Sequence, residues 1–162
     1  MSILQALEII IPTALFVAAP LIFTALGGVL SERAGVVNIG LEGLMIIGAF
    51  VGIVFNLNFV DVFGSATPWL AILAAMVAAA IFSLLHAVAS ITFKADQVVS
   101  GVAINFLALG LTLFLVKNIY EKGQTDRISM SFNKMDVPIL SDIPIIGKIF
   151  FSGGYITSYI AI

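Results

Sequence analysis

The chain of 162 residues contains no cysteine, a single histidine and few charged residues. The lack of cysteine excludes disulfide bonds, thiol catalysis and zinc sites built from cysteine. One histidine and scattered carboxylates form no recognisable metal cluster and offer little for a catalytic triad. Charged residues make up 10% of the chain, against about 25% in soluble domains, and 61% of the residues are hydrophobic. We therefore expect an integral membrane protein.

Nucleotide-binding and hydrolase motifs are also missing from the sequence. Gly147-Lys148 is followed by Ile149 and has no glycine-rich loop before it, so the phosphate-binding motif G-x-x-x-x-G-K-[ST] does not occur. No G-x-S-x-G nucleophile motif occurs either. We expect a chain that is not itself an enzyme and that binds no cofactor or metal. The net charge of −2 also gives no basic surface for a nucleic-acid polymer.

Long apolar runs dominate the sequence, and they predict an all-α bundle of transmembrane helices. Four spans are expected, at residues 9–30, 36–55, 69–93 and 98–116, with the start of a fifth at residues 155–162. Residues 117–149 carry charges of both signs and predict a long solvated loop. Only eight residues follow Gly154, whereas a span needs about 20. The chain is therefore expected to be the truncated N-terminal part of one larger transmembrane domain, residues 1–162.

One polar segment, residues 31–43, interrupts the apolar sequence between the first two spans. It combines three charged groups, an amide and three glycines: Glu32, Arg33, Gly35, Asn38, Gly40, Glu42 and Gly43. A single helix over residues 9–55 would be about 70 Å long, against a bilayer core of about 30 Å, so we expect a turn between Ser31 and Gly35. The segment is either a short interfacial turn or a broken helix on a translocation path.

Polar residues inside the predicted spans are the candidates for a substrate pathway: Asn38, Glu42, His86, Ser100 and Asn105. Asn38 and Glu42 are four residues apart and would share one face of a helix. Glu42 is expected to be shielded from lipid, with Arg33, a backbone amide or another span as its partner. His86 lies either in a close helix contact or on a polar path. Asn105 either joins helices or lines a cavity.

Residues 27–43, which run without interruption from Gly27-Gly28 to Glu42-Gly43, resemble a signature of the permease subunits of bacterial ABC importers for nucleosides and simple sugars. These subunits belong to the branched-chain amino acid/ribose-like permease superfamily. A weaker similarity runs through residues 96–105 and into the following loop. Within the group, the chain is most similar to nucleoside permeases that work with a basic-membrane-protein-type lipoprotein.

The resemblance implies a multi-pass protein of the bacterial plasma (inner) membrane that imports nucleosides or simple sugars. Its implied partners are a cytoplasmic ABC ATPase that binds ATP-Mg, a second permease half, identical or paralogous, an external substrate-binding lipoprotein and the lipid bilayer. Two other functions stay open on the residues alone. An ion- or proton-coupled carrier would use Glu32, Glu42 and His86 as a relay. A membrane scaffold would use the glycine and alanine stripes for assembly only.

The orientation of the chain is predicted differently by two arguments. Five Lys and Arg residues lie on the side of the long loop and two on the other side, which favours a cytoplasmic loop. The resemblance implies that this loop is external, and we expect it to be external.

Overall fold

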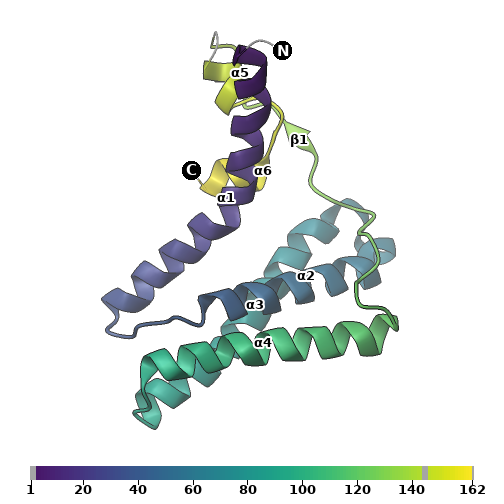
Figure 1. Ribbon diagram of the computed structural model, residues 1–162. Helices are drawn as coiled ribbons and strands as arrows, with labels where there is room; N and C mark the ends of the chain where they lie inside the picture. The colour runs from purple at the N-terminus through teal and green to yellow at the C-terminus, as the bar shows by residue number, and fades with distance from the viewer. Residues whose placement is uncertain (1–2, 144–145, 162) are drawn as a thin grey trace. The chain divides into compact units, whose positions relative to one another are not determined.

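The computed structural model describes residues 3–143 and 146–161, and it divides into two compact units. The core unit is residues 27–131. The terminal unit is formed by residues 3–26 and 132–161. Helix α1 (Ile3–Arg33) contributes residues to both units and carries Pro12 and Pro20 in its interior. Figure 1 shows the course of the chain, which is all-α apart from one very short strand pair.

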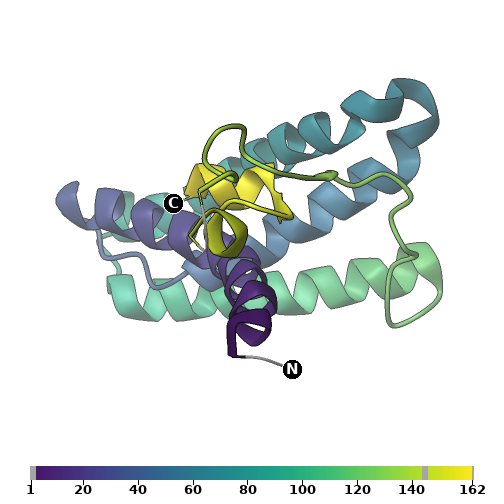
Figure 2. The ribbon, with the colours of Figure 1, turned by 90° about the horizontal axis from the view of Figure 1, so that it is seen from above.

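The core unit contains three long helices that pack side by side. They are α2 (Leu41–Phe63), α3 (Thr67–Ala87) and α4 (Gln97–Tyr120). The 3₁₀ turn η1 (Gly64–Ala66) joins α2 to α3, and the π-helix η2 (Val88–Thr92) continues α3. α2 and α3 run antiparallel, and α4 lies along α2 (Figures 1 and 2).

Small residues bring α2 and α3 close together. A Cβ atom added to Gly52 would lie 3.6 Å from Ala75 Cβ, and one added to Gly48 would lie 4.0 Å from Ala79 Cβ. These are ordinary van der Waals distances, so the two glycines allow the backbones to approach without leaving a gap. Such spacing of small residues is typical of helix packing in membranes.

Three helical stretches in the described part of the chain are long and apolar enough to cross a membrane: Gln5–Arg33, Leu41–Thr92 and Gln97–Tyr120. The second stretch has 52 residues and includes both α2 and α3. A straight helix of that length would measure about 78 Å, far more than a bilayer core of about 30 Å. Its folding into an antiparallel pair gives two helices of crossing length, in accord with the predicted polytopic bundle.

The helix boundaries differ from those of the predicted spans at α2. The helix begins at Leu41, not near residue 36, because residues 36–40 are not helical. It also continues beyond residue 55 to Phe63, where Gly64 adopts a φ of 51°. The rings of Phe55 and Phe59 stack at 4.6 Å on this added part of the helix. Which helices cross the bilayer stays a prediction.

The terminal unit contains short elements after residue 132. Strand β1 (Lys134–Met135) pairs antiparallel with β2 (Gly154–Tyr155), and the short helices are α5 (Ile146–Phe150) and α6 (Ile156–Ala161). The Tyr159 hydroxyl donates to Met135 O at 3.2 Å and accepts from Gly154 N–H at 2.9 Å. The predicted start of a fifth span corresponds to β2 and α6, except for residue 162, which lies outside the described residues, as do residues 144–145 of the predicted loop.

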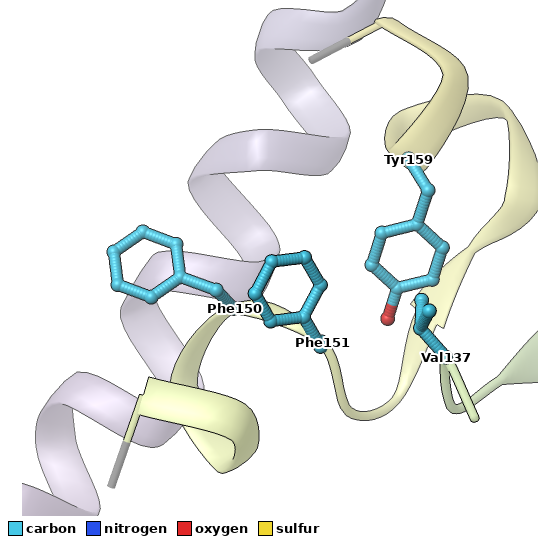
Figure 3. Close-up of a pocket in the computed structure, with 4 residues that line it drawn as sticks. All are labelled: Val137, Phe150, Phe151 and Tyr159. Atoms are coloured by element: carbon cyan, nitrogen blue, oxygen red, sulfur yellow. The ribbon is translucent and has the colours of Figure 1, made fainter. Parts of the chain in front are cut away.

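An apolar pocket of about 260 Å³ lies in the terminal unit, and Figure 3 shows its lining. The side chains that line it are Val137, Phe150, Phe151 and Tyr159. None of them is a predicted site residue, and the Tyr159 hydroxyl is already bonded to the strand pair.

Candidate functional site

The end of α1 is built so that the chain leaves the helix at Gly35, where φ is 83°. Val36 N–H donates to Ser31 O at 3.1 Å, and Gly35 N–H donates to Glu32 O at 2.9 Å. This pair of bonds around a left-handed glycine is the Schellman motif, which satisfies carbonyls that the helix leaves free. The predicted turn between Ser31 and Gly35 is therefore confirmed. We call the non-helical residues 34–40 the helix break.

The start of α2 receives its cap from another helix. Its own N-cap residue, Gly40, has no side chain to offer. Asn105 of α4 instead accepts a hydrogen bond from Gly43 N–H at 2.7 Å through Oδ1, and its Nδ2 donates to Ile39 O at 3.1 Å. Asn38 accepts from Gly40 N–H at 3.0 Å. Because the first N–H groups of a helix lack partners within it, Asn105 supplies what the local sequence does not.

The peptide groups on both sides of Val37 are held by α3 and α4. Gln97 Oε1 accepts from Val37 N–H at 2.7 Å, and His86 Nε2 lies 3.3 Å from Val37 O. A carbonyl only accepts, so His86 Nε2 carries the proton in this arrangement. The other nitrogen of a neutral ring is then an acceptor, and Ser100 Oγ, at 3.0 Å from Nδ1, donates to it. His86 is buried, and its own carbonyl accepts from the Ser90 hydroxyl.

Glycines allow the helix break to lie directly against the backbone of α4. A Cβ atom on Gly101 would lie 2.9 Å from Gly40 N, and one on Gly43 would lie 2.9 Å from Ile104 O. A Cβ atom on Gly40 would lie 3.1 Å from Ile104 Cγ2. Side chains at these positions would meet backbone atoms or a packed branch, so the contact requires glycine.

The charged residues of the polar segment do not join this network. Glu32, Arg33 and Glu42 are exposed, and within the described ranges 3–143 and 146–161 their side chains form no ion pair or hydrogen bond. The expectation that Glu42 is shielded and paired is therefore wrong for this part of the chain. Asn38 and Glu42 also do not share a helix face, because α2 begins only at Leu41. Glu42 lies in the first turn of α2, where the helix dipole favours a negative charge without a partner.

The structure thus brings together four of the five predicted pathway residues, Asn38, His86, Ser100 and Asn105, and leaves Glu42 apart. It adds Gln97 and Gly101, which periodicity and composition did not single out. Both lie within residues 96–105, the region of weaker family similarity. Among the described residues no group of three or more His, Cys, Asp and Glu could hold a metal ion.

An all-α bundle of apolar helices packed against a hydrogen-bonded, non-helical segment is an arrangement that membrane transport proteins use. Irregular backbone at membrane depth requires partners within the protein, and transporters use broken helices in this way. The comparison with known families agrees. The chain belongs to the family described as branched-chain amino acid transport system / permease component, whose model matches residues 10–149. The chain is a multi-pass membrane protein of this permease family, and the predicted family resemblance is confirmed.

Individual relatives are similar over most or all of the chain. The guanosine ABC transporter permease protein NupQ of Bacillus subtilis (strain 168) is 65% identical over 162 residues, which is 100% of this chain and 51% of the relative. The nucleoside ABC transporter permease protein NupC of Lactococcus lactis subsp. cremoris (strain MG1363) is 48% identical over the same shares. The putative glucose ABC transporter permease protein TsgC13 of Haloferax volcanii is 33% identical over 149 residues, 90% of the chain and 42% of the relative.

The chain spans about half the length of the first two of these relatives, 51% in each case. No solved structure matches the chain significantly.

Proposed function

We propose that the chain forms part of the transmembrane subunit of an ATP-driven importer whose cargo is a nucleoside. The observation that carries the proposal is the 65% identity, over the whole chain, to a permease named for guanosine. The 48% identity to a permease named for nucleosides supports the same cargo class. Simple sugars are the second candidate cargo, favoured by the 33% identity to a putative glucose permease.

In this proposal the energy comes from a separate subunit. The family is that of a permease component, so ATP-Mg would be bound and hydrolysed by a cytoplasmic ATPase. A second permease half would complete the membrane bundle, and an external binding lipoprotein would deliver the cargo. ATP binding and hydrolysis would shift the bundle between two states, because the ATPase interacts differently with each of them.

Within the proposed pathway, the polar residues divide into two roles. His86, Ser100 and Asn105 use their polar atoms on the helix break or on each other, so we assign them to holding it in place. Asn38 is half-buried, and its carboxamide nitrogen has no hydrogen-bond partner within the described part of the chain. Its N–H groups are therefore free donors for the hydroxyl or carbonyl groups of a polar, neutral cargo.

An ion-coupled carrier is supported less well. A relay would bring Glu32, Glu42 and His86 within hydrogen-bond reach of one another, directly or through water. Both carboxylates are exposed, and the two nitrogens of His86 already face Val37 and Ser100. The similarity to ABC permeases also favours the ATP-driven importer over this alternative.

The test is uptake of labelled guanosine into sealed vesicles that contain the full-length permease, its second half, the ATPase and the binding lipoprotein. We expect uptake that requires internal ATP and persists when an uncoupler collapses the proton gradient. Unlabelled nucleosides should compete better than ribose. Uptake that vanishes with the uncoupler and persists without ATP would contradict the proposal and favour the ion-coupled carrier.

A further inference from the structure

Helix α1 is shared by the two compact units, and the boundary between them falls inside it, directly before Gly27. In the terminal unit, the centre of the Phe16 ring lies 4.7 Å from the centre of the Tyr155 ring. In the core unit, Gly28 lies close to Leu41, because a Cβ atom added to Gly28 would be 2.9 Å from Leu41 Cδ1. The first part of α1 is therefore held by the terminal unit and its last turns by the core unit. The helix passes from one unit to the other at Gly27.

Gly27 is a glycine that neither backbone conformation nor packing requires. It lies in the interior of α1 and does not have a positive φ. Within the part of the chain that the structure describes, no packing neighbour lies within 4 Å of the position that a Cβ atom would take. Alanine would fit there and has the higher helix propensity. What glycine provides at such a position is a lower resistance to bending, and helices kink at pairs of small residues such as Gly27-Gly28.

The two prolines of α1 do not lie at this boundary. Pro12 and Pro20 are both in the terminal unit, and Pro20 is seven residues before Gly27. The turn after Pro20 is reinforced by the Thr24 hydroxyl, which donates to Pro20 O at 2.7 Å. A bend at either proline would therefore deform the terminal unit instead of moving it as a whole.

The second connection between the units is short and irregular. Met130 O accepts from Asn56 Nδ2 of the core unit at 2.9 Å, and β1 begins at Lys134 in the terminal unit. Residues 131–133, between these two points, form neither helix nor strand. Domain hinges consist of a few residues that absorb changes in φ and ψ, and the chain crosses between the units only at Gly27 and in this segment.

We propose that α1 bends at Gly27, so that the terminal unit and the core unit move relative to each other as two bodies. Residues 28–33 and the helix break stay fixed on the core unit in this movement. The bend itself does not depend on the cargo or on the source of energy. Its use in the change between the two states of an importer rests on the proposed function.

The first test measures distances between spin labels in the full-length permease, assembled with its partners in nanodiscs. Ile10→Cys in the terminal unit is combined with Val99→Cys or Phe114→Cys on α4, all at exposed positions. A bend of about 20° at Gly27 displaces residue 10, which is about 25 Å away along the helix, by about 9 Å. We expect at least one of the two distances to change when ATP is trapped on the ATPase with vanadate. The matched control replaces the label at residue 10 with Leu30→Cys, at an exposed position of α1 after Gly27, and its distances should stay the same.

The second test compares Gly27→Ala with Gly110→Ala. Both glycines lie in helix interiors with open space around the new Cβ, so both substitutions should raise the midpoint of thermal unfolding by about 1–3 °C. Only Gly27→Ala should lower the ratio of bent to straight α1, by about fivefold, the factor by which alanine favours a helical conformation relative to glycine. It should therefore narrow the nucleotide-free distance distributions of the residue 10 label and reduce ATP-dependent uptake. Gly110→Ala should leave both unchanged.

Three results would overturn the proposal. The first is a set of residue 10 distances that neither ATP nor Gly27→Ala alters. The second is an equal change in the Leu30 control pairs, which would place the movement outside α1. The third is a lower unfolding midpoint for Gly27→Ala, which would show that Gly27 packs against another part of the complete protein. If the unsubstituted complex took up no guanosine, the proposed function would fail, whereas the nucleotide-free distance distributions would still decide whether α1 bends at Gly27.

Discussion

The most informative single substitution is Asn105→Leu, because this one side chain of α4 bonds both to Ile39, just before α2 begins, and to Gly43, in the first turn of α2. The substitution removes the bonds from Gly43 N–H, at 2.7 Å, and to Ile39 O, at 3.1 Å. Hydrogen bonds between membrane helices contribute about 0.6 kcal/mol on average and up to about 1.7 kcal/mol each. Two such bonds give an expected loss of about 1–3 kcal/mol in the free energy of unfolding. The free-energy penalty for leaving the Gly43 N–H and Ile39 O groups without partners falls at the lower end of its usual range, because Asn105 is only half-buried.

The assay is thermal unfolding of the purified full-length permease in nanodiscs, together with ATP-dependent uptake. The matched control is Asn58→Leu, which makes the same chemical change at an exposed position of α2. Asn58 Nδ2 donates only to Val54 O of its own helix, at 2.7 Å, so its loss should change the free energy of unfolding by less than about 0.5 kcal/mol. If Asn105→Leu and Asn58→Leu have equal effects on stability and uptake, the helix break is not held by Asn105 and the reasoning is refuted.

Two further predictions concern packing and orientation. Gly43→Ala should destabilise the permease by about 1–3 kcal/mol, because the new Cβ would lie 2.9 Å from Ile104 O. Gly48→Ala should be neutral or slightly stabilising, because its new Cβ would lie 3.8 Å from the nearest atom, Ala75 O. Equal unfolding midpoints for the two variants would contradict this. Single cysteines at Gln124 and Ala95, in a chain that has no cysteine of its own, should react with impermeant reagents from the outside and the inside of the membrane, respectively. Labelling of Ala95 but not Gln124 from outside would show that the count of positive residues predicts the orientation correctly.

Local features of the helix break could be predicted from sequence, because they depend on neighbouring residues. The length limit of a bilayer span and the glycine at position 35 together predict a turn before Val36, and the Schellman bonds form there. The start of α2 could not be predicted in the same way. Residues 36–39, three of which are apolar, look like the first turn of a span, but the peptide groups of Val37 and Ile39 bond to side chains from α3 and α4. Contacts between residues about 50 to 66 positions apart leave no periodic signal in the sequence.

The same limit explains the errors at Glu42 and at the end of α2. A carboxylate among apolar residues predicts a buried partner, yet one at the first turn of a helix is stabilised by the helix dipole and can stay exposed. Asn56, Asn58 and Asp61 resemble loop residues by composition. The stacked rings of Phe55 and Phe59 and the bond from Asn58 to Val54 O are instead compatible with a continued helix. Composition does not distinguish these two cases, whereas the packing does.

The π-helix η2 determines where this region of the chain can change its length. Phe93 N–H donates to Val88 O, five residues back, at 3.1 Å, so the turn contains one residue more than an α-helical turn. Deleting Ala89 would return this turn to α-helical spacing while His86 before it and Gln97 after it keep their local helices. A deletion between Gln97 and Asn105 would instead rotate the Asn105 side chain by about 100° around α4 and away from Gly43. Insertions and deletions of single residues are therefore expected at η2, and not in the first turns of α4, among permeases that share this arrangement.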